Sequence, residues 1–316
     1  MSNRNLDVLV VGELNVDLIL NEIQGFPEVG KEIVARTMKI TLGSSSAIFA
    51  SNLSSLGSSV AFLGKIGQDD FANLVLSSLR AKKVNTDHII SSAEHSTGLT
   101  VVMNYDMDRA NVTYPGAMEH LEENEVTDAI LSKFRHLHVS SIFLQPGLLK
   151  GAAILFKRAK KLGLTTSMDP QWDPSEEWDL DLHGLLPHID IFMPNTEEFK
   201  HLTKSGDIAS GIQSVRSVAN TIVIKDGING AHVWNQDQLF SKPAFINEEA
   251  VDCIGAGDSF NAGFIREFLK GEPLLRCLEA GNATGALNTM APGGTTAFED
   301  MEKIRKIAQT RFSYTL

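Results

Sequence analysis

Six short runs of apolar, mostly β-branched residues recur along the chain, and they restrict the fold more than any other feature. The runs are nearly continuous in hydrophobicity instead of alternating with polar residues, which is typical of strands buried on both faces of a parallel sheet. They are Leu6–Val11, Val60–Leu63, Leu137–Ile142, Thr165–Met168, Ile189–Met193 and Thr221–Ile224.

Segments with helical periodicity separate these runs, so strands and helices alternate over most of the sequence. Such alternation predicts an α/β fold with a doubly wound, mostly parallel sheet flanked by helices. A hairpin-like stretch, Gly230–Phe240, follows the last run and leads to three further helices. The expected helices are Ala47–Leu56, Phe71–Lys82, Leu148–Leu162, Glu197–Leu202, Ile212–Ala219, Gly257–Leu269, Leu274–Met290 and Phe298–Arg311.

Two stretches, Leu18–Leu42 and Gly98–Tyr114, break this alternation. They read as strands that expose one face and lie outside the main sheet. We therefore expect residues 1–316 to form a single domain, with a small β-sheet lid formed by insertions at about 13–43 and 97–116. Such a lid has edge strands that can pair across a two-fold axis, so we also expect a homodimer through the lid.

The charge balance and the cysteine content limit the partners and the compartment. The chain carries 28 Lys+Arg against 39 Asp+Glu, a net charge of −11, so no general basic surface invites nucleic acid or an anionic membrane. The two cysteines, Cys253 and Cys277, lack metal-ligand spacing and suit a reducing compartment. No stretch approaches the roughly 20 apolar residues that a membrane span requires. We expect a cytoplasmic protein without nucleic-acid or membrane partners.

The strongest chemical signal is the small-residue turn and helix start between Asp252 and Gly263, which reads DCIGAGDSFNAG. Glycine and alanine allow backbone N–H groups to point into one concavity at a helix N-terminus, and this is an anion-binding arrangement. A carboxylate just inside the turn, Asp258, would stand beside a phosphate bound there. The alternative is that Asp258 only caps the helix while the glycines form a tight turn.

This string resembles the C-terminal signature of the PfkB, or ribokinase-like, carbohydrate kinase family, with Cys253 in the place of a threonine. The resemblance implies a ribokinase-like fold and an ATP- and Mg²⁺-dependent kinase. It assigns the role of catalytic base to Asp258. It assigns the anion hole to the preceding turn, namely Gly255, Ala256 and Gly257.

The N-terminal part resembles the sugar-binding segments of the same family. GELNVD follows the first predicted strand, and a second segment, GSSSA, matches the family's glycine-rich signature in position. Two departures stand out, because Ser44 replaces the second glycine and Ile48 replaces an asparagine that would bind sugar. By resemblance the substrate is bound by Asn15, Asp17, Gly43, Ser44 and Ser45.

Three further segments resemble the family's nucleotide-binding parts. Asn195 and Glu198 match an Asn-x-x-Glu motif that organises Mg²⁺-bound water, although the same pair reads equally as a helix capping box. The turn after the strand at Thr221–Ile224 and a small-residue helix match the family's nucleotide pocket, with a β-hairpin turn and helix packing as the plainer interpretations. The residues assigned to the nucleotide are Asn195, Glu198, Lys225, Gly227, Gly230 and Asn282.

The remaining candidates rest on weaker signals. Gln145, after a predicted strand, and Arg109, in the second insertion, are candidate substrate-binding residues. Asp252, with the Gly293 loop, marks the place where some relatives bind a monovalent cation such as K⁺. In the segment DPQWDP, Gln171 and Asp173 stand where fructokinase-like members have Asn and Arg. An aspartate there would repel a phosphate, which argues against that subgroup.

These signals together favour ATP-dependent phosphorylation of a hydroxyl on a small sugar or sugar-like substrate. A nucleoside kinase of the same family is an alternative, because Ile48 leaves room that a sugar-specific amide would fill. A non-catalytic sensor of sugar or nucleotide is another, supported only by the degenerate GSSSA segment. A dinucleotide-dependent dehydrogenase is set aside, since no G-x-G-x-x-G follows the first strand.

Overall fold

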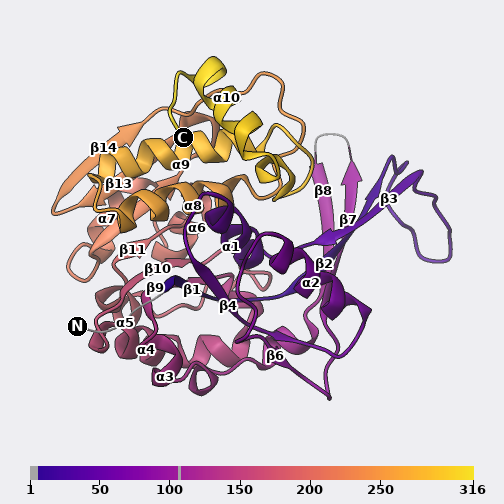
Figure 1. The fold of residues 1–316 in the computed structure, drawn as a ribbon, viewed down its shortest axis with the longest axis horizontal. Coiled ribbons are helices and arrows are strands. Elements are labelled where there is room, and N and C mark those ends of the chain that lie inside the picture. Colours follow the sequence, from indigo (N-terminus) through magenta and orange to yellow (C-terminus); the bar gives the residue numbers. More distant parts are fainter. Residues whose placement is uncertain (1–5, 106–107) are drawn as a thin grey trace.

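An eight-stranded sheet forms the centre of the structure, a computed structural model that describes residues 6–105 and 108–316. Its strands are β1 (Leu6–Val11), β4 (Val60–Leu63), β9 (Phe134–Ser140), β10 (Thr165–Asp169), β11 (Ile191–Phe192), β12 (Thr221–Lys225), β13 (Ala231–Asn235) and β14 (Gln238–Lys242). They follow the order β14-β13-β12-β11-β10-β9-β1-β4, and only β13 runs antiparallel to its neighbours (Figure 1). The predicted doubly wound, mostly parallel sheet is confirmed.

Helices cover both faces of this sheet, as the alternating sequence pattern predicts. In Figure 1, α8, α9 and α10 lie above the sheet, and α3, α4 and α5 lie below it. The helices are α1 (Ser45–Ser55), α2 (Asp70–Ala81), α3 (Asp128–Leu131), α4 (Pro146–Lys161), α5 (Leu182–Leu185), α6 (Thr196–Thr203), α7 (Ile208–Val215), α8 (Ala256–Leu269), α9 (Leu274–Asn288) and α10 (Met301–Phe312).

The two faces of β1 explain why its sequence is apolar at every position. Val8 and Val10 belong to a core formed with α1, α2, α8, α9 and α10, whereas Leu9 and Val11 belong to a second core formed with α3–α7. All four side chains are completely buried. Successive strand residues point to opposite faces, so a strand between two cores needs an apolar residue at each position.

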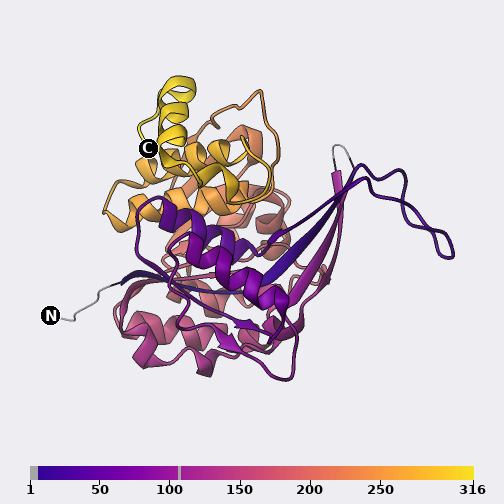
Figure 2. The ribbon, with the colours of Figure 1, turned by 45° about the vertical axis from the view of Figure 1, so that its right-hand side comes forward.

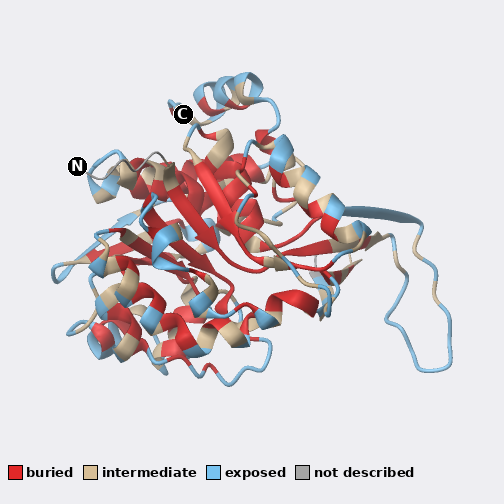
Figure 3. Ribbon diagram, turned by 60° about the horizontal axis from the view of Figure 1, so that its bottom comes forward, coloured by how far each residue is buried: buried red, intermediate tan, exposed pale blue. Residues whose placement is uncertain are grey.

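A second, smaller sheet projects from the body and corresponds to the expected lid (Figures 1 and 2). It consists of β2 (Asn15–Asn21), β3 (Thr37–Leu42), β7 (Gly98–Tyr105) and β8 (Asp108–Tyr114), in the order β3-β2-β7-β8. All four strands fall within the expected ranges 13–43 and 97–116. Residues 106–107 of the second range, and residues 1–5 of the expected domain, lie outside the described residues. The long loop between β2 and β3 is exposed, in contrast to the buried strands of the large sheet (Figure 3).

Several predicted elements have other bounds in the structure, and local backbone chemistry explains two of these differences. Helix α7 begins at Ile208 instead of Ile212, because Asp207 forms a capping box with Ser210. Strand β9 ends at Ser140 because Ser141 adopts a left-handed conformation, with φ of 56°. A two-stranded ribbon, β5 (Lys65–Ile66) with β6 (Ile90–Ser91), was not predicted at all. Among the described residues, no helix is both long and apolar enough to span a membrane.

Candidate active site

The small-residue turn lies directly before α8. Gly255 is the N-cap residue and has a φ of 75°, a left-handed conformation that glycine adopts without strain. A Cβ atom at this position would lie 2.6 Å from the Cα atom of Gly294, so only glycine fits. Ala256 and Gly257 then begin the helix, and Asp258 lies in its first turn with an exposed fraction of 6%. The N-terminus of α8 therefore lies beside a buried carboxylate, and the N–H of Ala256 donates to Cys253 O over 3.2 Å.

Asp252 connects this turn to the loop that contains Gly293. One carboxylate oxygen, Oδ1, accepts a hydrogen bond from Ile254 N over 2.9 Å, and Oδ2 accepts one from Gly293 N over 2.8 Å. The structure thus brings together the two segments that the sequence pairs as a candidate cation site.

A cluster of buried polar side chains surrounds Asp258. Asp169, at the carboxyl end of β10, is completely buried. Its Oδ2 atom accepts hydrogen bonds from Lys225 Nζ over 2.5 Å, from Asn261 Nδ2 over 2.5 Å and from Gln171 Nε2 over 3.0 Å. Gln171 Nε2 also donates to Asp258 Oδ1 over 3.1 Å. Three segments, after β10, at the end of β12 and in α8, therefore meet at the carboxyl edge of the sheet, where open α/β sheets bind ligands.

Burial and neighbouring charges shift the pKa values of several groups in this cluster. Burial raises the pKa of Asp258 well above its ordinary value, and the negative charge of Asp169 raises it further, while Lys225 opposes both. Burial and Asp169 also raise the pKa of Glu198 to about 7. Burial acts to lower the pKa of Lys225, but Asp169 and Glu198 outweigh it, so the net shift is upward. Perturbed groups of this kind gather at functional sites.

The predicted sugar-binding residues meet on the inner face of the lid. Asn15 Nδ2 donates to Asp17 Oδ1 over 3.0 Å and to Thr100 Oγ1 over 2.9 Å. Burial raises the pKa of Asp17 to about 6, against the opposing effects of the hydrogen bond from Asn15 and the charge of Arg109. A Cβ atom on Gly43 would lie 2.3 Å from Asp17 Oδ1, so the carboxylate packs on a position that must be glycine.

The other predicted substrate-binding residues are placed less directly. Ser44 is the N-cap of α1 at a φ of 69°, which explains the glycine that the resemblance expects there, and its Oγ donates to Glu13 O. Ser45 begins α1. Gln145 is completely buried and donates to Ser140 O and Ser141 O, and its Oε1 lacks a hydrogen-bond partner among the described residues. Ile48 packs against Gly255 and Gly294 with an exposed fraction of only 4%.

A cavity of about 330 Å³ lies on the other side of the α8 turn. Apolar side chains such as Phe245, Ile246 and Phe260 form part of its wall, together with Gly285 on α9. Small-molecule sites commonly combine such walls with a few polar groups. Six residues predicted for the nucleotide or the anion hole line this same cavity, namely Lys225, Gly227, Gly230, Ala256, Gly257 and Asn282.

Asn195 and Glu198 lie at the N-terminus of α6, beside this cluster. Asn195 Oδ1 accepts from Glu198 N over 2.9 Å, and Glu198 Oε2 accepts from Asn195 N over 2.8 Å, so the capping box is real. Asn195 also pairs with Lys225 in an isolated parallel bridge. The cap holds the carboxylate of Glu198 near Lys225, so the structural and the functional interpretation are compatible.

Sequence reasoning missed several members of the site and misjudged one. Asp169 and Asn261 form the centre of the cluster, and neither was predicted as a site residue, although Asp169 begins the DPQWDP segment and Asn261 lies in the DCIGAGDSFNAG segment. Asp173 is buried, with an exposed fraction of 4%. Its carboxylate accepts hydrogen bonds from Ser175 N and Trp178 N, and therefore shapes its own loop instead of repelling a phosphate. No group of three or more metal-ligating side chains occurs in the described ranges.

Glu13, which follows β1, is a further buried carboxylate that the sequence did not single out. Its two oxygens accept from Ser46 N and Ser46 Oγ, and only 1% of the residue is exposed. Burial raises its pKa from 4.5 to about 7. The folded protein binds a proton at Glu13 more tightly than the unfolded chain does. The resulting contribution to the free energy of unfolding is fully present below pH 4.5 and is lost as the pH rises through about 7.

We accordingly expect Glu13→Gln to stabilise the protein at pH 8 by up to about 3 kcal/mol and to have almost no effect near pH 4.5. Urea unfolding of the variant and the wild type at both pH values measures this difference. Glu94→Gln, at an exposed position, is the matched control and should change neither value. Equal stabilities at pH 8 would contradict the buried, proton-linked role of Glu13.

The chain is similar to proteins of known sequence over nearly its whole length. The chain matches the pfkB family of carbohydrate kinases over residues 5–301. It is 28% identical to an ATP-dependent ribose-1-phosphate kinase of Halopiger xanaduensis, covering 92% of this chain and 94% of that one. It is 25% identical to a nucleoside kinase of Methanothermobacter thermautotrophicus, covering 98% and 97% of the two chains.

Solved structures share the fold. A putative ribokinase II from E. coli, crystallised with ATP and Mg²⁺, superposes with a TM-score of 0.83 at 24% identity, over 96% of this chain and 99% of that one. The family match extends from β1 to the start of α10 and includes the α8 turn, Asp258 and all four strands of the lid. The chain therefore belongs to the pfkB family of carbohydrate kinases.

Proposed function

We propose that this kinase uses ATP and Mg²⁺ to phosphorylate a hydroxyl of a small sugar, with Asp258 as the general base. The observation that carries the proposal is the position of Asp258: it is buried in the first turn of α8, with Gly257 lining the 330 Å³ cavity and Gln171 bridging to Asp169. The ATP and Mg²⁺ bound to the E. coli relative add support at the level of the fold.

In the proposed step, Asp258 accepts the proton of the substrate hydroxyl while the hydroxyl oxygen attacks the γ-phosphorus. The new P–O bond forms as the bond to the β-phosphate oxygen breaks, and ADP leaves with the electron pair. Backbone N–H groups of Gly255, Ala256 and Gly257 bind the negative charge of the transferred phosphoryl group. Lys225, held by Asp169, lies at the same place and adds a positive charge.

The donor set suits a magnesium ion that is bound mainly through phosphates and water. Mg²⁺ usually keeps several waters and takes only one or two carboxylates from the protein. Glu198, nearly buried beside Lys225, is the proposed partner of such a water, with Asn195 holding it in place. When bound, the ion would neutralise charge on the phosphates. A monovalent cation, K⁺ in particular, is proposed at Asp252 and the Gly293 loop.

The substrate is proposed to lie between Asp258 and the lid. Asn15, Asp17, Gly43, Ser44 and Ser45 would bind its hydroxyls, with Arg109 and Gln145 as further contacts. Closure of the lid, formed by residues 13–43 and 97–116 of this single domain, would exclude water, which competes as phosphoryl acceptor. A nucleoside is the second candidate substrate, because one relative is a nucleoside kinase.

ATP binding gives a prediction at Gly257. An added Cβ there would meet nothing closer than Lys225 Nζ at 3.8 Å, so Gly257→Ala should fold normally. The methyl group would nevertheless intrude where the phosphates bind, at a cost of about 1–3 kcal/mol. We expect the KM for ATP to rise roughly 10- to 100-fold. Gly206→Ala, with open space around it, is the control, and an unchanged KM at Gly257 would place ATP elsewhere.

The test of the function is ADP release with Mg-ATP across ribose, fructose, other hexoses, ribose 1-phosphate, ketodeoxy acids and nucleosides. A sugar that gives turnover supports the proposal, and a nucleoside that alone gives turnover supports the second candidate. Silence across the panel, with ATP binding intact, would favour the sensor that the degenerate GSSSA segment suggests.

A homodimer through the lid belongs to the same proposal. One face of the small sheet carries mostly apolar side chains, and three of them, Met38, Ile40 and Val112, have exposed fractions of 62%, 41% and 61%. A second copy of the lid would cover this apolar face. If sedimentation shows a monomer at working concentration, the proposed dimer is rejected. A cytoplasmic location remains proposed from the cysteine usage.

A further inference from the structure

The side-chain amide of Gln171 lies between two buried carboxylates. Its Nε2 atom donates to Asp169 Oδ2 over 3.0 Å and to Asp258 Oδ1 over 3.1 Å. The amide nitrogen carries two hydrogens and the amide oxygen none, so these two acceptors fix which end of the amide faces the cluster. Each carboxylate thus receives one hydrogen from the same neutral group.

The backbone at Gln171 adopts a conformation that glutamine rarely takes. Its φ is 61°, in the left-handed region where non-glycine residues are uncommon and Asn is better tolerated than Gln. Such outliers persist only where the surroundings enforce them, and they gather at functional sites. At this position the enforced backbone conformation places the side-chain amide of Gln171 within hydrogen-bonding distance of Asp258.

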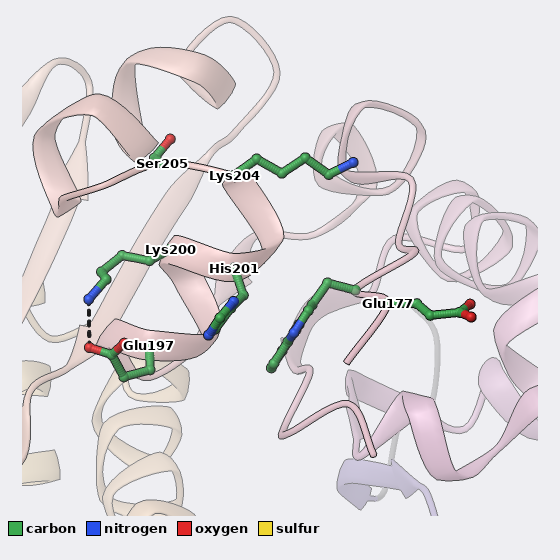
Figure 4. Close-up of a pocket in the computed structure, with 7 residues that line it drawn as sticks. Glu177, Glu197, Lys200, His201, Lys204 and Ser205 are labelled. Atoms are coloured by element: carbon green, nitrogen blue, oxygen red, sulfur yellow. Dashed lines mark hydrogen bonds and ion pairs between the residues drawn. The ribbon is translucent and has the colours of Figure 1, made fainter. Parts of the chain in front are cut away.

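The rest of the loop is anchored firmly enough to enforce it. Asp173 accepts from Ser175 N over 2.9 Å and from Trp178 N over 2.7 Å, and the Trp178 ring stacks on His201 at 4.8 Å between centroids, with 5° between the planes. Figure 4 shows His201 beside Glu197 and Lys200 on α6, with Glu177 on the other side of the pocket. Helix α6 also carries Glu198, so the loop is docked on an element of the active site.

From this geometry we propose that Gln171 is a positioning residue for Asp258, holding Oδ1 so that the other carboxylate oxygen is directed to the substrate hydroxyl. The inference deepens the proposed function and rests on Asp258 as the base. Gln171 also supports the charged form of Asp258, because a hydrogen bond donated to a carboxylate favours that form over the protonated one. An Asp258 without this donor would bind its proton more tightly and rotate more freely.

Four other charged or titratable groups act on Asp258, and any pH effect must be separated from theirs. Asp169 on β10, Glu13 after β1 and Glu198 on α6 raise its pKa, whereas Lys225 at the end of β12 lowers it. A neutral substitution at Gln171 changes none of these charges. The effect on Asp258 is therefore due to the two lost hydrogen bonds of Gln171, one to Asp258 itself and one to Asp169.

The test replaces Gln171 by methionine, which has a similar length but no donor, with Gln171→Asn as the conservative variant. We expect Gln171→Met to lower kcat about 10-fold and to move the acidic limb of the kcat/KM profile upward by about 1 pH unit, with the KM for ATP within about twofold of the wild type. Gln171→Asn should restore part of both. Gln213→Met, on the exposed face of α7, should change nothing. A Gln171→Met profile that superposes on the wild type would overturn the inference.

A second measurement separates this inference from the proposed function. The pKa of Asp258 can be followed by ¹³C NMR of the aspartate carboxyl groups, with Asp258→Asn identifying the resonance. The pKa should rise in Gln171→Met even if no panel substrate gives turnover, in which case only the proposed function fails. If the wild type turns over a substrate but the pKa of Asp258 is the same in Gln171→Met, the Gln171 inference is rejected and the proposed kinase function stands.

Discussion

Asp258→Asn should fold like the wild type and lose roughly 10²- to 10⁴-fold in kcat, the range typical of a lost general base. The substitution keeps the shape of the side chain and the polar contact with Gln171, but removes the group that accepts the proton. Because burial already disfavours the charged carboxylate, its replacement by a neutral amide should leave the thermal midpoint unchanged or slightly raised. Steady-state kinetics at saturating ATP and sugar, together with thermal unfolding, measure both results.

The control for this variant is Asp237→Asn, which removes an exposed carboxylate whose only described partner is Arg216. It should retain full turnover. If Asp258→Asn kept near-wild-type kcat, another group would have to accept the proton, and Glu13 and Glu198 would be the next candidates because burial raises the pKa of each to about 7.

Asp169→Ala should lower the free energy of unfolding by about 3–5 kcal/mol, the usual cost of breaking a buried ion pair from one side. Asp169 is completely buried, and its Oδ2 atom accepts from Lys225, Asn261 and Gln171 at once. Without the carboxylate, the Lys225 ammonium loses its direct partner. Water replaces that partner poorly, because only 12% of the Lys225 side chain is exposed. Urea unfolding at pH 7 measures the loss.

An exposed ion pair provides the matched comparison for Asp169. Asp237→Ala removes the partner of Arg216, and because 64% of the Asp237 side chain is exposed, the cost should stay below about 1 kcal/mol. Similar losses for the two variants would mean that the Asp169 cluster is hydrated or rearranges easily. The cluster would then be too loose to hold Lys225 at the phosphate site.

The periodicity of the sequence was enough to predict the large sheet and the lid, because burial on two faces or on one leaves a direct trace in the residue pattern. The run Leu6–Val11 matches β1 in both bounds, since Val8 and Leu9 face different cores and neither can be polar. The predicted ends of elements were wrong where a helix cap or a left-handed residue determines them. Asp207 before α7 and Ser141 after β9 are the two examples.

The candidate site was predictable where one segment carries the chemistry. The α8 turn and Asp258 lie within seven sequence positions of Asp252, so the motif itself predicts their proximity. Asp169 and Gln171 belong to the DPQWDP segment and Asn261 to the DCIGAGDSFNAG segment, about 90 residues apart. Only the arrangement of β10 and α8 in three dimensions shows that they meet. Asp173 was misjudged for the same reason, because its carboxylate turns back to the N–H groups of its own loop.

The most direct test of the account is the stoichiometry of the reaction with the best panel sugar, measured as ADP formed against phosphorylated sugar recovered, for the wild type and Asp258→Asn. The account predicts one phosphosugar for each ADP in the wild type and a matched loss of both products in the variant. ADP formed without phosphosugar, or equal phosphosugar formation by Asp258→Asn, would contradict it.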